Sequence, residues 1–328
     1  YKEHPHREKW IEGFNRWAIN SIGTYKDRMN TDQYMGKSLR NFWMKGVTFH
    51  PDYTTENHSF IHPEYMAAGI VLKAEAAATL LMTGNALPDT IFRNNENVYE
   101  KTIGKWCQDD GLIIPVQGQD WWYTRYHGNH MLHTAMSLFH KKENSAVYLK
   151  KSIEMMEKLQ NSHALGTLLE ENPDQTIDEY GHYRLRDMEH ASVMSLVYSF
   201  LLHNYLEEPA ALKPMDSIKR ELSGVYEYPY GCTVVNRRED SFSSFSWRNK
   251  VMAFNLPKSG MWSVTPIVAS MTGEVHFKER KMPESLCNER DIRDSIKRYV
   301  DVRKEGFCTA ARVQRDGGRL IQDISFVS

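Results

Sequence analysis

The sequence lacks the features that mark several common classes of protein. It holds four cysteines in 328 residues and no CxxC pair, which argues against a zinc knuckle and against a dense disulfide framework. It has no excess of one charge, because 41 basic residues stand against 42 acidic ones and the net charge is −1. A protein that binds by neutralising a phosphate backbone is more basic, so we expect no nucleic-acid partner.

Membrane and nucleotide-binding signals are also missing. No apolar run approaches the ~20 residues that span a bilayer, so we expect no membrane insertion. The first residues, YKEHPHREKW, contain no signal-peptide core. Because the sequence starts in mid-pattern, we expect a signal peptide outside the given chain and a periplasmic or secreted location. Neither a Gly-rich phosphate loop nor a dinucleotide fingerprint is present.

Aromatic residues are what the sequence has in abundance. They make up 12% of the chain, with eight tryptophans and seventeen tyrosines, and several stand beside polar groups rather than in apolar runs. Flat rings with a polar handle suit the faces of sugars, which favours a carbohydrate ligand. The alternative is that these large side chains fill the core of a large helical domain.

The spacing of apolar residues predicts a multidomain α+β protein. Apolar positions three and four apart predict helices in KWIEGFNRWAINSI, HPEYMAAGIVLKAEAAATLLMTG, NENVYEKTIGKWC, HGNHMLHTAMSLFHKK, AVYLKKSIEMMEKLQ and EHASVMSLVYSFLLHNYL. From Gly224 apolar and polar residues alternate, and RDGG at 315–318 is typical of a hairpin turn, so this part predicts antiparallel sheet. We therefore predict a helical domain over 1–223 and a strand region over 224–328.

A first polar cluster precedes one of the predicted helices. Residues 52–63 contain too many turn and cap residues to be helical, and Pro63 fits the first position of a helix. We expect Asn57, His58 and His62 to lie at the positive end of that helix, where an anionic group is favoured. The alternative is that these side chains only cap the helix.

A second cluster lies between Cys107 and Met136 and again leads into a predicted helix. It is dense in aromatic and basic side chains, with Trp121, Trp122, Arg125, Tyr126 and His127. A tyrosine beside an arginine can donate or accept a proton, and the tryptophan pair can stack on a sugar. His127, His130 and His133 are spaced for one helical face, but the absence of HExxH and of an acidic ligand leads us to predict no catalytic metal.

A third cluster lies between Asp178 and Met194. We expect His190 in the first turn of a helix, with Asp187 or Glu189 to orient it. Arg184 and Arg186 are candidates to hold a carboxylate in bidentate fashion. The alternative is a salt-bridged helix start.

The residue types in these clusters favour one reaction. β-Elimination at a uronic acid needs a neutralised carboxylate, a base for the C5 proton and an acid for the leaving oxygen, roles that Asn, His, Tyr and Arg can fill. A glycoside hydrolase needs two facing carboxylic acids. It remains an alternative, with Glu56, Asp109, Asp110, Asp120 and Glu189 as candidates. A non-catalytic carbohydrate-binding protein is a third.

The motifs resemble those of one superfamily. An Asn57–His58 pair opening a helix, a later DG…YH segment, a further histidine and a β-rich region resemble the heparinase II/III-like and alginate lyase-like polysaccharide lyases. The resemblance implies an (α/α) toroid packed on an antiparallel β-sandwich, here shorter than a complete one. It also implies cleavage of an acidic polysaccharide by elimination, without a cofactor other than a structural divalent cation, which stays open.

The resemblance also implies residue roles. Asn57 matches the asparagine that neutralises the carboxylate, and His58 matches its neighbouring histidine. Tyr126 matches the catalytic tyrosine, and His190 matches the second catalytic histidine. Arg248, in the segment that resembles the first strands of the sandwich, is expected to reach the cleft. The polysaccharide, endo or exo action, and the oligomeric state stay open.

Overall fold

The structure is a computed structural model. It describes residues 3–57, 60–117, 129–168, 183–206, 208–247, 251–258, 262–263, 274–279, 284–285, 297–315 and 318–328.

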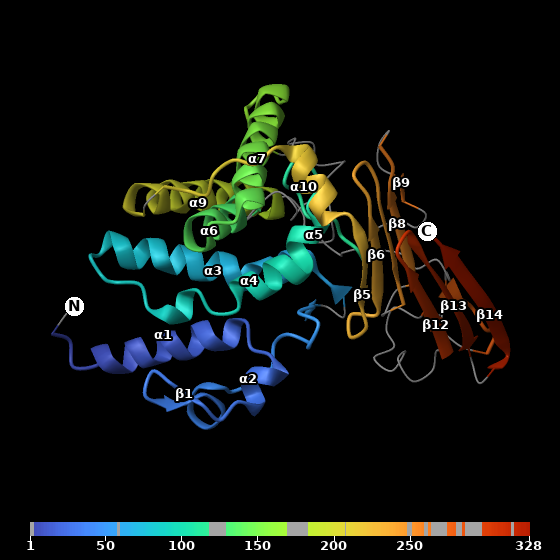
Figure 1. Ribbon diagram of the computed structural model, residues 1–328, viewed down its shortest axis with the longest axis horizontal. Helices are drawn as coiled ribbons and strands as arrows, with labels where there is room; N and C mark the ends of the chain where they lie inside the picture. Colours follow the sequence, from blue (N-terminus) through green and yellow to red (C-terminus); the bar gives the residue numbers. More distant parts are fainter. Residues whose placement is uncertain are drawn as a thin grey trace. The chain divides into compact units, whose positions relative to one another are not determined.

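Helices dominate the first two thirds of the chain (Figure 1). The α-helices are α1 (Arg7–Ser21), α2 (Tyr25–Met29), α3 (Pro63–Met82), α4 (Asn95–Val98), α5 (Gly104–Trp106), α6 (Asn129–His140), α7 (Glu143–Ser162), α9 (Tyr183–Tyr205) and α10 (Met215–Leu222). Single turns of other helix types lie at Leu39–Trp43 and Tyr99–Ile103, which are π-helical, and at Asp89–Ile91, which is 3-10.

The strands are concentrated after Gly224. Four short strands precede it, β1 (Gln33–Tyr34), β2 (Lys37–Ser38), β3 (Glu56–Asn57) and β4 (Phe60–Ile61). The others are β5 (Gly224–Tyr228), β6 (Thr233–Arg237), β7 (Phe242–Ser246), β8 (Met252–Leu256), β9 (Trp262–Ser263), β10 (Glu274–Val275), β11 (Glu284–Ser285), β12 (Lys297–Arg303), β13 (Gly306–Arg315) and β14 (Leu320–Val327). Every described strand pair is antiparallel, so the protein is of the mixed α+β class.

Several predicted elements are confirmed. The segments with helical spacing are helical, and α3 begins at Pro63, where the fixed backbone angle of proline suits the first helical position. The predicted hairpin at 315–318 joins β13 to β14, which pair from Arg315 with Leu320 onward. Gly318 there has a φ of +92°, a conformation that favours glycine.

The contacts divide the chain into two compact units. Unit 1 comprises residues 1–53, 64–114 and 123–215, and unit 2 comprises residues 54–63, 115–122 and 216–328. The sequence had predicted one domain boundary, between residues 223 and 224. The contacts instead assign two short segments from the first half of the chain to the unit that holds the large sheets.

Unit 1 is helical and contains the longest apolar helix, α3. By length and composition alone α3 would cross a membrane, a property that core helices of soluble proteins share. Its Lys73 side chain is fully buried, and Nζ donates a hydrogen bond to the Arg93 carbonyl oxygen at 2.7 Å. Burial, together with the nearby charge of Arg93, lowers the pKa of Lys73 to about 7.

Unit 2 contains a five-stranded sheet in the order β5-β6-β7-β8-β9 and a three-stranded sheet in the order β12-β13-β14. Side chains of both sheets share one hydrophobic cluster: Cys232, Val234, Phe245, Trp247, Val251, Ala253, Phe307, Ala311 and Val313. Trp247 Nε1 donates to Thr309 Oγ1 at 2.6 Å and so ties the sheets together inside the cluster. Period-two alternation places Phe245 on the cluster side of β7 and Ser244 on the opposite face.

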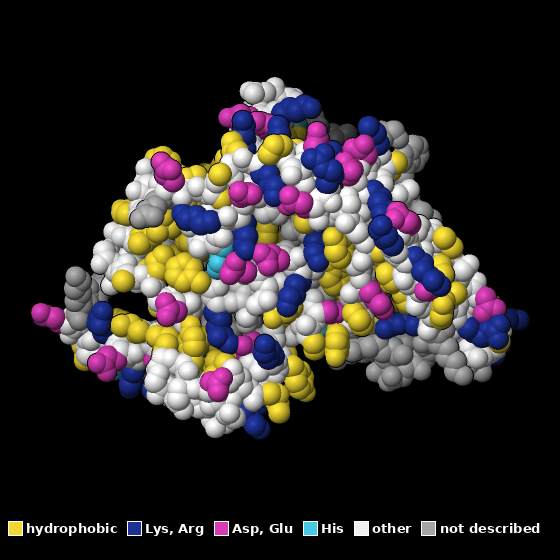
Figure 2. Space-filling model, viewed as in Figure 1, with side chains coloured by type: hydrophobic (Ala, Val, Ile, Leu, Met, Phe, Trp, Pro, Cys, Tyr) yellow, Lys and Arg dark blue, Asp and Glu magenta, His cyan; other side chains and the backbone are white. Residues whose placement is uncertain are grey.

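Charged side chains of both signs are interspersed on the face shown in Figure 2. This distribution agrees with the nearly balanced composition of the sequence. Cys107, Cys232 and Cys308 form no disulfide among the described residues, and Cys287 lies outside them.

Candidate functional site

The first predicted cluster folds as a small hairpin in unit 2. Strands β3 and β4 pair antiparallel, with Asn57 opposite Phe60 and Glu56 opposite Ile61. Thr54, just before the hairpin, is fully buried and lies against Gly231 in the turn before β6. A Cβ at Gly231 would come 3.0 Å from the Thr54 side chain, so a larger residue there would have to displace Thr54 by a few tenths of an ångström.

Residues 115–117 link this hairpin to the large sheet of unit 2. The backbone N–H of Ile61 donates to Gln117 Oε1 at 2.7 Å, and Ser244 Oγ donates to the Val116 carbonyl oxygen at 3.2 Å. Because Ser244 lies on the face opposite the shared hydrophobic cluster, residues 115–117 lie on that second face of the sheet. Val116 and Gln117 are both fully buried.

Two amide donors in this arrangement have no partner. Asn57 Nδ2 and Gln117 Nε2 are both buried from solvent, and neither forms a hydrogen bond within the part of the chain that the structure describes. The orientation of the Gln117 amide follows from its other contact, because only its oxygen can accept the Ile61 N–H. An unsatisfied buried donor costs about 1–3 kcal/mol, so a ligand with acceptor oxygens would be favoured here.

We call this arrangement the carboxamide cluster: Asn57, Gln117 and strand β4, which contacts both. A carboxamide NH₂ group offers donors only at its nitrogen, and an ionised carboxylate accepts through both oxygens. Hydrogen bonds to a charged acceptor are stronger than those between neutral groups. The chemistry that the carboxamide cluster suits best is therefore the binding of a carboxylate.

His62 lies between the hairpin and α3. It is fully buried and directly precedes Pro63, the first residue of the helix. The prediction that this segment leads into a helix start is confirmed. Asn57, however, lies in strand β3 and not within the cap of the helix.

The candidate site residues of the second predicted cluster lie outside the described residues. They are Trp121, Trp122, Arg125, Tyr126 and His127, and the same holds for His58 and Arg248. Asp120, a candidate of the hydrolase alternative, also lies there. The cluster is described over 107–117 and again from Asn129 in helix α6, where Asn129 and His130 are buried.

His133 in α6 has a structural role. Its Nε2 lies 2.8 Å from the Gly111 carbonyl oxygen, which accepts only, so Nε2 carries the proton and Nδ1 accepts from the Tyr99 hydroxyl at 3.3 Å. Burial lowers the pKa of His133 to about 4, which keeps the ring neutral. Among the described residues no group of three His, Cys, Asp or Glu side chains is arranged to hold a metal ion.

The described part of the third predicted cluster, from Tyr183 onward, is helical, which corrects the expectation for His190. Helix α9 begins at Tyr183, so His190 lies two turns inside the helix rather than in its first turn, and its side chain is exposed. Arg184 and Arg186 lie within the first turn of α9.

The acids of the hydrolase alternative belong to different units. Asp109, Asp110 and Glu189 lie in unit 1, and Glu56 lies in unit 2. Asp110 Oδ1 accepts the backbone N–H of Leu112 at 2.9 Å, as an aspartate in a tight turn does. This hydrogen bond gives Asp110 a structural role in the turn.

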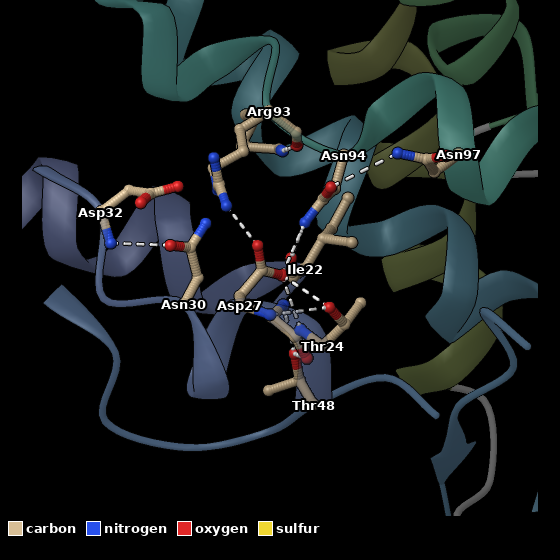
Figure 3. A network of polar contacts seen from close by, with 11 residues as sticks. Ile22, Thr24, Asp27, Asn30, Asp32, Thr48, Arg93, Asn94 and Asn97 are labelled. Carbon is tan, nitrogen blue, oxygen red and sulfur yellow. Dashed lines mark hydrogen bonds and ion pairs between the residues drawn. The ribbon is translucent and has the colours of Figure 1, made fainter. Parts of the chain in front are cut away.

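Another polar cluster, in unit 1, contains a carboxylate that accepts several hydrogen bonds (Figure 3). We call it the Asp27 cluster: Thr24, Asp27, Arg93 and Asn94. The Asp27 carboxylate accepts hydrogen bonds from Thr24 N at 2.9 Å, from Thr24 Oγ1 at 2.8 Å and from Asn94 Nδ2 at 3.0 Å, and it pairs with the Arg93 guanidinium. Thr24 and Asp27 form the capping box of α2, so this carboxylate stabilises local structure.

The sequence patterns did not single out Gln117 as a candidate site residue. Its only local signal is a single carboxamide between Pro-Val and Gly, directly after the apolar run Leu112–Ile114. The bond that orients its side chain comes from the backbone N–H of Ile61, which is 56 positions away in the sequence.

Comparison with known proteins adds no family to this description. No protein-family profile matches the chain, and no curated protein matches it. The resemblance to polysaccharide lyases is therefore carried by the sequence motifs alone.

Proposed function

We propose that the protein is a polysaccharide lyase that cleaves a uronic-acid-containing polysaccharide by β-elimination. The observation that carries the proposal is the carboxamide cluster, in which Asn57 Nδ2 and Gln117 Nε2 are buried donors without partners. A uronate carboxylate supplies acceptor oxygens of the kind that these two donors lack. Asn57 is also the residue that the resemblance assigns to carboxylate neutralisation.

The proposal extends to the fold. We expect the helices of unit 1 to form part of an (α/α) toroid and the sheets of unit 2 to form a β-sandwich, as in the heparinase II/III-like and alginate lyase-like enzymes. Two observations support this expectation. Helices α6 and α7 are consecutive and in contact, and the five-stranded and three-stranded sheets share one hydrophobic cluster.

In the proposed reaction, hydrogen bonds to the uronate carboxylate stabilise the negative charge that develops when the C5 proton is removed. His58 or His190 takes that proton, the C5–H electron pair forms the C4–C5 double bond, and the C4–O bond breaks. Tyr126 protonates the leaving glycosidic oxygen; Tyr126 acting as both base and acid is the variant of the same mechanism.

Further residues are proposed to bind the sugar chain. Trp121 and Trp122 stack on sugar rings, and the remaining contacts come from His62, Arg125, His127, Arg184 or Arg186, and Arg248. None of these steps requires a cofactor, and the proposed setting is periplasmic or secreted, where acidic polysaccharides are found.

The test is incubation of the protein with uronate-containing polysaccharides while the absorbance of a conjugated C4–C5 double bond is followed. New reducing ends with that absorbance support elimination. New reducing ends without it would instead indicate hydrolysis. Binding without any product would indicate a non-catalytic carbohydrate-binding protein.

Variants connect the activity to the carboxamide cluster. We expect Asn57→Ala to lower kcat/KM by about 10²–10³-fold, as loss of one charge-stabilising donor does. Tyr126→Phe should abolish elimination, whereas a hydrolase should largely survive it. The matched control is Asn204→Ala, because Asn204 is an exposed asparagine on α9. Equal activity of Asn57→Ala and Asn204→Ala would contradict the proposal.

A further inference from the structure

A pocket of about 510 Å³ in unit 1 has three cationic residues and no acidic residue in its lining. It is lined by Arg28, Met29, Arg40, Asn41, Met44 and Lys45. Three of these six side chains are permanently or normally positive, and none is a carboxylate. The three cations come from three different stretches of backbone, which are α2, the π-helical turn Leu39–Trp43 and the residues after it.

Backbone hydrogen bonds hold each of these stretches in place. Arg28 lies in α2, whose capping box fixes the helix start, and its Nη1 donates to the Met44 carbonyl oxygen at 3.3 Å. The Arg40 N–H donates to the Asn30 carbonyl oxygen at 2.9 Å. The Lys45 N–H donates to Asn20 Oδ1 at 2.8 Å. The backbone from which each of the three cations projects is therefore held in place, and the Arg28 side chain is held as well.

The charge of the pocket is not compensated within the described part of unit 1. Arg28, Arg40 and Lys45 form no ion pair with any described carboxylate, whereas other cations of this unit do. Lys37 pairs with Glu12 at 2.8 Å, and Lys142 pairs with Glu96 at 2.7 Å. Like charges that share a pocket repel one another, so an anion that enters it is attracted by all three.

We propose that this pocket binds a tetrahedral oxyanion, a sulfate or phosphate group. Two guanidinium groups present planar arrays of donors that suit such oxygens, and the lysine ammonium adds a third charge. The oxygens of a tetrahedral group point in different directions and can reach three separate cations, whereas a carboxylate offers two oxygens in one plane. Asn41 supplies a neutral polar contact, and Met29 and Met44 give the pocket an apolar side.

The group can belong to a free ion or to a substituted sugar, and one experiment separates these sources. The full chain is titrated calorimetrically at low ionic strength with inorganic sulfate, with inorganic phosphate, and with a uronate tetrasaccharide in its sulfated and unsulfated forms. We expect sulfate and phosphate to bind to the parent protein. The affinity for the unsulfated tetrasaccharide should be the same in the parent and in the pocket variants. Tighter binding of the sulfated tetrasaccharide than of free sulfate identifies a sugar ester as the source. The reverse order identifies a free ion.

Variants decide whether the pocket is responsible. Arg28→Gln, Arg40→Gln and Lys45→Gln should each weaken binding of the oxyanion about tenfold, because each removes one charge-assisted contact. Lys26→Gln is the matched control, since Lys26 is an exposed cation on the same helix that does not line the pocket. Circular dichroism verifies that all four variants fold.

Two results would overturn the proposal. One is an affinity for sulfate and phosphate that is unchanged in all three pocket variants, and the other is an absence of binding to the parent protein. Both readouts are independent of lyase activity, so a protein that fails to eliminate uronates can still confirm this site. Conversely, an active lyase that shows unchanged anion binding in the variants loses only this inference.

Discussion

The Asp27 cluster of unit 1 and the carboxamide cluster of unit 2 differ in how their polar groups are satisfied. The Asp27 carboxylate receives hydrogen bonds from Thr24 and Asn94 and a charge partner from Arg93. In the carboxamide cluster, Asn57 Nδ2 and Gln117 Nε2 are equally inaccessible to water but have no acceptor. The Asp27 carboxylate is thus satisfied within its own unit, whereas the two carboxamide donors keep unused bonding capacity within the part of the chain that the structure describes.

The largest effect on the free energy of unfolding is expected for Lys73. It is a buried lysine of unit 1 whose Nζ donates to the Arg93 carbonyl oxygen. Its pKa is about 7 in the folded protein and near 10.5 when unfolded, so between these values the unfolded state binds one more proton and the free energy of unfolding rises with pH. The rise contributed by Lys73 is on the order of 5 kcal/mol. It is measured by urea denaturation from pH 6 to pH 10 on the parent and on Lys73→Met.

The variant should lack this part of the pH dependence and should gain stability mainly near pH 7 and below. An identical pH profile for both proteins would show that Lys73 is solvated in the folded state.

The Asp27 cluster should show the next largest effect. Asp27→Ala leaves the Arg93 guanidinium without its partner and removes the capping box of α2, so we expect a loss of about 3 kcal/mol in the free energy of unfolding. Chemical denaturation measures it. Glu12→Ala is the control, because Glu12 pairs with Arg16 and Lys37 at a more exposed position and should cost about 1 kcal/mol at most.

Trp247 tests whether partnered polar groups of unit 2 behave like those of unit 1. Trp247→Phe removes the bond to Thr309 Oγ1 and leaves a small cavity between the two sheets. We expect a loss of about 2 kcal/mol, measured by thermal and chemical denaturation. Trp17→Phe, at a side chain that is 40% exposed, should change stability by much less. Equal losses would mean that the bond across the sheets contributes nothing.

The smallest effect is expected at the residue with the unpartnered donor. Asn57→Ala removes an unsatisfied buried donor and some packing contacts, so the free energy of unfolding should rise by about 1 kcal/mol rather than fall. Denaturation of this variant beside Asp27→Ala is the most direct comparison of the two clusters. A loss at Asn57 as large as that at Asp27 would mean that the asparagine stabilises the fold.

Local sequence signals predicted much of the fold. The start of α3 followed from Pro63, whose ring sets the backbone angle that a first helical residue needs. The β13–β14 hairpin followed from strict alternation on both sides of an Asp-Gly-Gly turn. The start of α9 was predicted too late, because its first turn is polar and lacks the apolar spacing on which the prediction depended.

The candidate site was predicted only in part, because its geometry depends on residues far apart in the chain. Asn57 stood out through its neighbours in a polar stretch. Gln117 did not stand out, because its burial and its bond to Ile61 arise from tertiary contacts that the neighbouring sequence does not predict. The β3–β4 hairpin was not predicted either, because strands of two residues are too short to show an alternation of apolar and polar side chains.

The chain contributes to unit 2 in three separate passes, residues 54–63, 115–122 and 216–328. Its contacts therefore close very long loops, such as the 128 residues between Val116 and Ser244. On the ribosome, the hairpin that carries Asn57 leaves the exit tunnel long before the sheet that receives it exists. The surroundings of Asn57 are therefore completed late in synthesis, and a chain stopped before β7 would expose Thr54 and Val116 to the solvent and to chaperones that bind exposed apolar surface.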